Sequence, residues 1–430
     1  MKFDKRSPLF KRFWYTIFVL VLIHFLGFIT IPGINSKELL NIANNSPLTI
    51  LSMFSGGSFD TFSIMSMGVT AYITAQIIIQ LLQADVIPKL TEWSKAGEVG
   101  RHKLDQTTRA LTFILSIVQA TGITAGINSL TNGRFIINGT WYTYFVISML
   151  MTAGTFISMW FADQITEKGL GNGVSVLIAA GIIAKLPTIV GNLYASLKCY
   201  QGFNWYILIF LVVVFGLITL LIVWFTSSEL RIPVQYARRE AGTGEESYLP
   251  LKIIIPGVVP VIFASSVITI PQTLLLMAKP TQSSAFARIV KEFFSLDTTV
   301  GILIYGSMII FFTYLYSIVQ IEPEKLAENL QKQEAYIPEY MPGVSTSEYI
   351  KQLLYELSLP GSLFLTFVSI VPMILAHHIS TSLQIGLSGS SLLIITGVLV
   401  DIGRQIKGLK IKQNYGTFFN KQYELSLIHI

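Results

Sequence analysis

Long runs of apolar residues without a charged side chain alternate along this chain with shorter polar segments. A transmembrane helix needs about 20 predominantly apolar residues, and the pattern offers enough length for ten such spans. The last run is long enough for two helices, and we interpret its polar segment at residues 377–384 as the turn between them. The apolar runs comprise residues 13–36, 61–84, 110–133, 135–162, 169–184, 205–228, 253–278, 298–321 and 357–400.

Composition agrees with a membrane-spanning chain. Hydrophobic residues make up 52% of the sequence and charged residues only 13%, whereas soluble domains carry about 25% charged residues. The runs are continuously apolar and do not alternate with polar residues over about ten positions, which favours helices over a barrel. We interpret the first span as a retained helix, because basic residues precede it and no small-residue cleavage site follows it.

Lysine and arginine residues indicate the topology. With the amino terminus inside, most of the 30 Lys and Arg residues fall in inner segments, as the positive-inside rule requires. Both termini are therefore expected in the cytoplasm, and the net charge of +6 describes topology and not DNA binding. The basic residues expected outside are Lys37, Arg134, Lys185, Lys198, Lys279, Arg288 and Lys291.

Five spans on each side of residue 200 predict two halves of opposite orientation, the arrangement of an inverted repeat. We expect an N-terminal half at residues 1–200, a C-terminal half at residues 201–406 and a cytoplasmic tail at residues 407–430. The inner loops at residues 229–252 and 322–356 are long and charged. Partners are therefore expected on the cytoplasmic face.

Two segments depart from ordinary spans. The sequence FSGGSFDTFSIMSM (residues 54–67) is too polar to face lipid, so it is either an outer loop or a re-entrant segment surrounded by protein or water. The run at residues 253–271 contains Pro256, Pro260 and Pro271, which predict kinks in that helix.

No catalytic motif is present: neither GxxxxGK[ST] nor HExxH occurs, and we expect no enzyme, cofactor or metal site. The neighbours His377 and His378 make a weak metal candidate. His24 is the only ionisable residue near the middle of a span, and we interpret it as facing another helix. The lone Cys199 excludes an internal disulfide.

Three function classes remain open from the residues alone. A pore for unfolded polypeptide needs an apolar constriction that blocks ions by dewetting, and the aliphatic spans suit it. A secondary transporter or flippase for an amphiphile is the alternative, although ion-coupled transport usually places charged residues within the helices. A scaffold with a permanently closed pore is the third class, and it would not leak ions after deletion of residues 55–67.

A glycine-rich hairpin joins two spans in the sequence WFADQITEKGLGNGVSVLI (residues 160–178). Its three glycines permit the positive φ angles of a tight reversal, and we expect Asn172 to cap the next helix. Its charged residues belong at a water boundary: Asp163, Glu167 and Lys168. This order of residues resembles the second signature of the SecY/Sec61-alpha family, the channel subunit of the protein-conducting translocon.

The resemblance extends over nearly the whole chain, through further segments in the right order at residues 54–82, 91–109, 249–266, 324–338 and 389–401. It implies an all-α polytopic membrane protein with ten transmembrane helices in two inverted five-helix halves, a SecY-type clamshell with a re-entrant plug. It also implies a lateral gate between the second and third helices and the seventh and eighth, with Gln80 as a polar gate residue.

Further functional residues follow from the resemblance. The implied pore ring consists of Val69, Ile73, Val174, Ile178, Ile262 and Ile394. The implied plug covers about residues 55–67 and includes Gly56, Gly57, Phe59, Asp60, Phe62 and Ile64. The implied docking positions for cytoplasmic partners are Arg231, Arg238, Arg239 and Met341.

The implied partners are the SecE and SecG subunits, the SecA motor ATPase or the ribosome, unfolded polypeptides that carry signal sequences, and membrane lipids. Two positions depart from the family pattern. Ala71 stands where a proline is usual, and Met341 stands where an arginine precedes Pro-Gly. The loop at residues 238–249 is also short and acidic, which leaves room for an accessory paralogue. The tail after Asn420 suggests no function.

Overall fold

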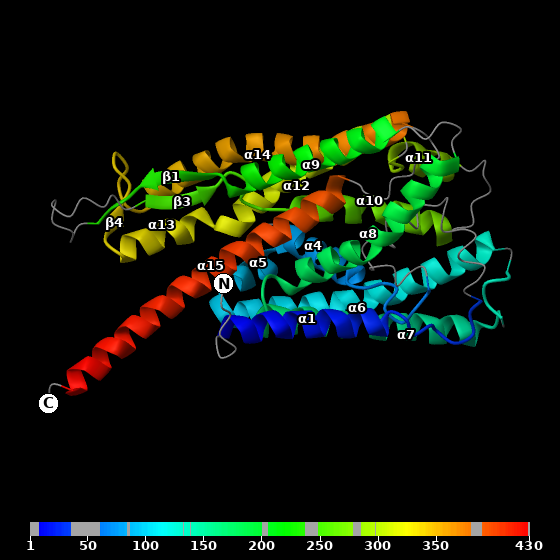
Figure 1. The fold of residues 1–430 in the computed structure, drawn as a ribbon, viewed down its shortest axis with the longest axis horizontal. Helices are drawn as coiled ribbons and strands as arrows, with labels where there is room; N and C mark the ends of the chain where they lie inside the picture. The colour runs from blue at the N-terminus through cyan, green and yellow to red at the C-terminus, as the bar shows by residue number, and fades with distance from the viewer. Residues whose placement is uncertain are drawn as a thin grey trace. The chain divides into compact units, whose positions relative to one another are not determined.

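The computed structural model describes residues 8–35, 61–83, 87–131, 133–137, 139–199, 205–236, 248–277, 285–296, 298–379 and 389–428. Within these residues, every expected span contains a helix, and the all-α polytopic fold is confirmed (Figure 1). The helices are α1 (Pro8–Leu26), α4 (Thr70–Gln83), α6 (Gly97–Leu130), α7 (Trp141–Lys168), α8 (Gly173–Cys199), α9 (Trp205–Ser227), α10 (Val259–Met277), α12 (Thr299–Ile321), α14 (Val344–Ile379) and α15 (Gly389–Ile428).

Six of the described helices are long and apolar enough by themselves to cross a membrane: α1, α6, α7, α8, α12 and α14. In α9 and α10 the apolar stretches, Val212–Ser227 and Val259–Gln272, are shorter than this length. Hydrocarbon offers no hydrogen-bond partners, so a helix, which satisfies its own backbone, is the structure that such sequences adopt.

The long inner loops contain ordered structure. Residues 229–252 form β1 (Glu229–Pro233), β2 (Gln235–Tyr236) and β3 (Tyr248–Lys252), with antiparallel pairing of β1 and β3. The second loop forms α13 (Pro323–Lys332) and β4 (Ala335–Tyr336), and β4 pairs with β2. The remaining short helices are α5 (Pro88–Lys95) and α11 (Ala285–Phe293).

The chain divides into two compact units, which we describe separately. In unit 1, α1 runs along α7 (Figure 1). In unit 2, α12 packs against both α10 and α14. Unit 1 comprises Met1–Tyr72, Phe113–Leu186 and Ile394–Ile430, and unit 2 comprises Ile73–Thr112 and Pro187–Leu393.

The glycines of the α7–α8 hairpin do not all act as expected. Only Gly171 has a positive φ, at 83°, whereas Gly169 has a φ of −101°. A Cβ at Gly169 would lie 2.6 Å from the Thr16 hydroxyl, and one at Gly173 would overlap the Ala162 carbonyl. Of the three glycines, only Gly171 uses the permitted positive φ, whereas at Gly169 and Gly173 the close approach of neighbouring atoms leaves no room for a side chain.

Side chains from distant parts of unit 1 bind the hairpin backbone. The Leu170 amide donates to Thr16 Oγ1 of α1 at 3.0 Å, and the Gly171 amide donates to Gln405 Oε1 of α15. Within the hairpin, the Val174 amide donates to Asn172 Oδ1 at 3.1 Å, so the predicted cap is confirmed. The hairpin therefore fixes the start of α8 relative to α1 and α15.

Two other expectations are corrected. His377 and His378 lie in the last turn of α14 and not in a turn between helices, because the helix continues to Ile379. Of the three prolines expected to kink the seventh span, only Pro271 lies well inside a helix. Pro256 precedes α10 and Pro260 occupies its first turn, where no intrahelical amide donor is required.

We predict that Gly173→Val destabilises the protein, because the new side chain would overlap the Ala162 carbonyl. Overpacking of this kind costs about 1–3 kcal/mol. The measurement is the thermal unfolding temperature of the purified protein in detergent. The matched control is Gly191→Val in the same helix, where no atom lies within 4 Å of an added Cβ. Equal unfolding temperatures for the two variants would contradict the close contact between Gly173 and the Ala162 carbonyl.

Candidate functional site

Residues 61–69, the described part of the predicted plug and its junction with α4, lie in the interior of unit 1. The Phe62 side chain is only 1% exposed, and Met65, Met67 and Val69 are buried with it. Ile64 is half-buried. Four predicted plug residues lie outside the described part of the chain: Gly56, Gly57, Phe59 and Asp60.

The plug backbone pairs with the segment that follows α1. The Ile31 amide donates to the Phe62 carbonyl at 3.3 Å, and the Ile64 amide donates to the Ile29 carbonyl at 3.1 Å. Thr30 and Ser63 lie opposite each other in the resulting bridge. This non-helical backbone is therefore satisfied by protein, the condition for such structure at membrane depth.

Phe62 combines tight packing with a strained backbone. Its φ is 45°, in the left-handed region that bulky side chains rarely adopt. Its ring meets the Phe135 ring edge-on, with 4.9 Å between the centroids. The surrounding protein therefore holds the plug in a conformation that the isolated chain disfavours.

Helix α7 packs against the other side of the plug segment. A Cβ at Gly154 would overlap the Ile64 carbonyl oxygen, so the two backbones touch. One turn further along, the Ser158 hydroxyl donates to Met65 Sδ at 3.3 Å. We call this arrangement of residues 29–31, 61–69 and the α7 positions 154 and 158 the plug seat.

Five of the six predicted pore-ring residues lie on helices, and the sixth, Val69, directly precedes one. Val69 immediately precedes α4, which carries Ile73, while Ile262 lies on α10 and Ile394 on α15. Val174 and Ile178 both lie on α8. Five are buried, and Val174 is half-buried. Their convergence on one ring stays a prediction.

Gln80 lies in unit 2, where α4 meets α12. Its side chain forms a hydrogen bond with Tyr316 of α12, while Gln80 Oε1 is buried without a partner among the described residues. The Phe263 ring of α10 packs edge-on against Tyr316, with 5.7 Å between the ring centroids. Sequence reasoning missed Tyr316 and Phe263, because no local pattern distinguishes them from other aromatic residues in the spans.

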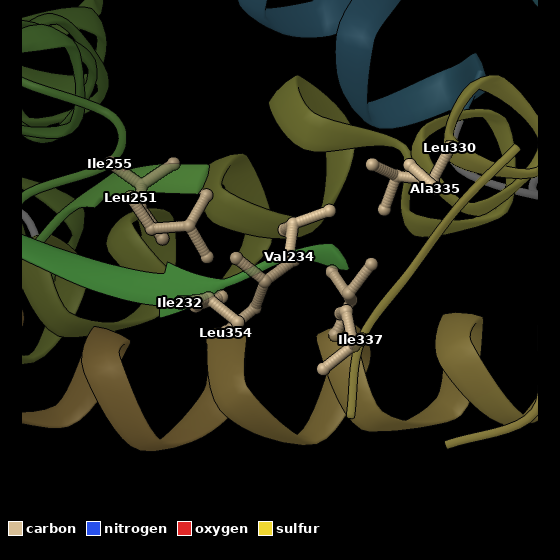
Figure 2. Close-up of a cluster of buried hydrophobic side chains, with 9 residues drawn as sticks. Ile232, Val234, Leu251, Ile255, Leu330, Ala335, Ile337 and Leu354 are labelled. Atoms are coloured by element: carbon tan, nitrogen blue, oxygen red, sulfur yellow. The ribbon is translucent and has the colours of Figure 1, made fainter. Parts of the chain in front are cut away.

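The inner loops build a small subdomain with its own core, which we call the loop subdomain (residues 229–236, 248–255, 323–343 and the first turns of α14). Figure 2 shows side chains from the strands and from α13 and α14 pointing into one cluster. The core residues are Ile232, Val234, Leu251, Ile255, Leu330, Ala335, Ile337, Ile350 and Leu354.

The surface of the loop subdomain carries two of the four predicted docking positions. The Met341 side chain is 80% exposed, and the Arg231 guanidinium lies over the Tyr248 ring, 4.8 Å from its centroid. Arg238 and Arg239 lie outside the described residues. A cavity of about 470 Å³ opens within the loop subdomain, and its lining includes Val234, Tyr236, Tyr248 and Asn329.

The fold and the plug seat define a multi-pass α-helical membrane protein with non-helical backbone enclosed among its helices. The SecY family model matches residues 63–403. The chain is 60% identical over 407 residues to Protein translocase subunit SecY 2 of Lactobacillus kefiranofaciens, which covers 95% of this chain and 99% of the relative. It is 44% identical to SecY 1 of the same organism, over 96% of this chain and 97% of that relative.

Solved structures share the fold at lower sequence identity. A structure described as a protein conducting channel superposes with a TM-score of 0.66 at 17% identity, covering 96% of this chain and 95% of that one. Sec61 in the canine ribosome–channel complex gives a TM-score of 0.60 at 17% identity with the same coverage. The chain belongs to the SecY family, as the resemblance in its sequence predicted.

We predict that Gly154→Val displaces the plug segment, because the new side chain would overlap the Ile64 carbonyl. The measurement is thiol labelling of Ser66→Cys, a fully buried position, in a Cys199→Ser background. The overlap should strain the closed conformation by about 1–3 kcal/mol. The rate of labelling at residue 66 should therefore rise roughly tenfold for each 1.4 kcal/mol of strain. Gly216→Val is the control, since nothing lies within 4 Å of its Cβ. Unchanged labelling in Gly154→Val would refute the seat.

Proposed function

We propose that this protein is the central pore-forming subunit of a Sec protein translocase. In this proposal it conducts unfolded secretory polypeptides across the membrane and releases transmembrane segments sideways into lipid. The observation that carries the proposal is the plug seat, in which non-helical backbone is enclosed by α7 and the segment after α1. An ordinary bundle of membrane helices has no need of such a segment.

The proposed pore closes by apolar contact. Val69, Ile73, Val174, Ile178, Ile262 and Ile394 are all β-branched aliphatic residues, and a ring of such side chains blocks ions by dewetting. It binds no particular side chain, which suits a path that every polypeptide sequence must traverse. The plug, which includes Phe62 and Ile64, seals the idle channel.

The proposed lateral exit lies where α4 meets α12. A buried amide with an unpartnered oxygen makes the closed contact around Gln80 and Tyr316 less favourable by about 1–3 kcal/mol. Separation of α4 from α12 at this contact would relieve that cost by exposing the Gln80 oxygen to water, and an apolar signal helix would occupy the lipid side of the opening. The gate would therefore respond to the hydrophobicity of a segment and not to its sequence.

We propose a bacterial plasma membrane location with both termini in the cytoplasm and the halves at residues 1–200 and 201–406. The chain itself performs no chemistry, so movement is driven by a partner. SecE and SecG partners would complete the channel, and SecA or a ribosome would dock on the loop subdomain around Arg231 and Met341. Structurally similar channels are described in complexes with ribosomes, which supports the ribosome as a partner.

We infer an accessory role within this family. The chain is 60% identical to a SecY 2 and 44% identical to the SecY 1 of the same organism. Met341 occupies the position at which the family usually has an arginine. Docking of the motor at this position would rest on apolar contact instead of a charge.

The channel proposal is tested by cross-linking a stalled secretory precursor that carries one cysteine. Single cysteines replace Ile262, a pore-ring position, and Leu217, an exposed position of α9, in separate Cys199→Ser proteins. We expect a disulfide to the precursor at residue 262 and none at residue 217, because the polypeptide travels inside the ring. A docked precursor that links to neither residue, or to both equally, contradicts the proposal.

We predict that Met341→Arg increases SecA-driven translocation without changing stability. The side chain is 80% exposed, so an arginine fits without repacking and adds a charge that can pair with an acidic partner. The measurement is ATP-dependent precursor import into vesicles at several SecA concentrations. Val344→Arg, three residues away and also exposed, serves as the control. Equal import by both variants would exclude a specific contact at residue 341.

A further inference from the structure

The short helix α11 (Ala285–Phe293) carries an apolar face that the described protein covers only in part. Its apolar residues recur at Phe286, Ile289, Val290 and Phe293, the spacing of one helix face. Val290 is 4% exposed and packs inward, whereas Ile289 is 52% exposed and Phe293 is 43% exposed. Ile289 and Phe293 lie one turn apart and form an exposed apolar edge.

Two transmembrane helices hold α11 at its C-terminal end. The Gln272 Nε2 amide of α10 donates to the Phe294 carbonyl at 2.6 Å. The Thr298 hydroxyl, which caps α12, donates to the Glu292 carbonyl at 2.7 Å. Because α10 and α12 both contribute a hydrogen bond, α11 is fastened to the membrane ends of both helices and its exposed edge has a fixed position.

This location sets the depth of α11 in the membrane. It lies between the last residue of α10, Met277, and the first residue of α12, Thr299 (Figure 1). Both neighbours are apolar helices of the membrane region, so α11 lies where hydrocarbon gives way to headgroups. A short amphipathic helix at this level places its apolar edge in the acyl boundary and its charged face among headgroups.

The charges around α11 favour anionic headgroups. Arg288 is exposed, and in the segment from residue 278 to 298 the three basic residues, Lys279, Arg288 and Lys291, outnumber the two acidic residues, Glu292 and Asp297. Most outer segments of membrane proteins carry few such residues. A local excess of basic residues beside an exposed apolar edge is the pattern of helices that bind anionic lipid surfaces.

We propose that α11 is an interfacial helix that binds the anionic surface of the outer leaflet through Ile289, Phe293 and Arg288. Through Gln272 and Thr298 it connects that surface to α10 and α12, the helices to which the resemblance assigns the lateral gate. The lipid contact requires only that these two helices span the membrane. It is independent of whether the chain conducts polypeptide.

The test uses the full-length Cys199→Ser protein in nanodiscs, which leave both membrane faces open to water. A fluorescent probe is attached to a single cysteine at Phe293 or, as the matched control, at Glu292 on the polar face. Quenching by a nitroxide on the upper acyl chain is compared with quenching by aqueous iodide. We expect the ratio of lipid to iodide quenching to be several-fold higher at residue 293 than at residue 292.

A second variant tests the charge. Arg288→Glu should lower lipid quenching at residue 293 in nanodiscs of phosphatidylglycerol and leave it unchanged in nanodiscs of phosphatidylcholine. Equal quenching by iodide at residues 292 and 293 would show that the edge faces water and would overturn the proposal. Protection of residue 293 from both quenchers would show that protein covers the edge, which also overturns it. An Arg288→Glu effect of equal size in both lipids would refute the anionic surface as the ligand.

Discussion

Backbone amides and carbonyls that leave a helix within a membrane must find partners inside the protein. This constraint explains the plug seat of unit 1. The plug seat satisfies its backbone through pairing between residues 29–31 and 62–64. The α7–α8 hairpin satisfies its amides through the side chains of Thr16, Thr166 and Gln405. Each partner comes from an element that must be in place first, so these regions cannot form independently of the helices around them.

The membrane region and the loop subdomain depend on different forces. Among the spans, hydroxyl groups return to carbonyls of their own helix, as Thr112, Thr124 and Ser317 do, and close approach at Gly154 and Gly173 supplies the contact between elements. The loop subdomain instead has a cluster of buried aliphatic residues between strands and α13, like a small soluble protein (Figure 2). The pairing of β2 with β4 joins segments about a hundred residues apart. The two inner loops therefore form one surface although they are separate in the sequence.

Features that depend on local sequence could be predicted, and features that depend on distant contacts could not. The spans follow from uninterrupted apolar runs, and the Asn172 cap follows from its place before a helix. The roles of Gly169 and Gly173 were missed because they depend on Thr16 and Ala162, which only the folded chain brings near. The alternation of Leu230, Ile232 and Val234 was a local signal for a strand in the first inner loop. Its pairing with β3 stays within that loop, but no local signal could identify β4 in the second loop as the partner of β2.

The strain at Phe62 has a consequence for a plug that must both seal and leave. A left-handed backbone at a bulky residue costs about 1–3 kcal/mol, and that cost is recovered when the segment leaves its seat. Burial of the ring favours the seat by about 1.5–3 kcal/mol, and the edge-on contact with Phe135 adds about 0.5–1.5 kcal/mol. The favourable and unfavourable contributions at this residue are therefore similar in size. In the proposed channel, departure of the plug would therefore recover the backbone cost at Phe62 while losing the burial of its ring, so this residue itself adds little to the barrier against opening.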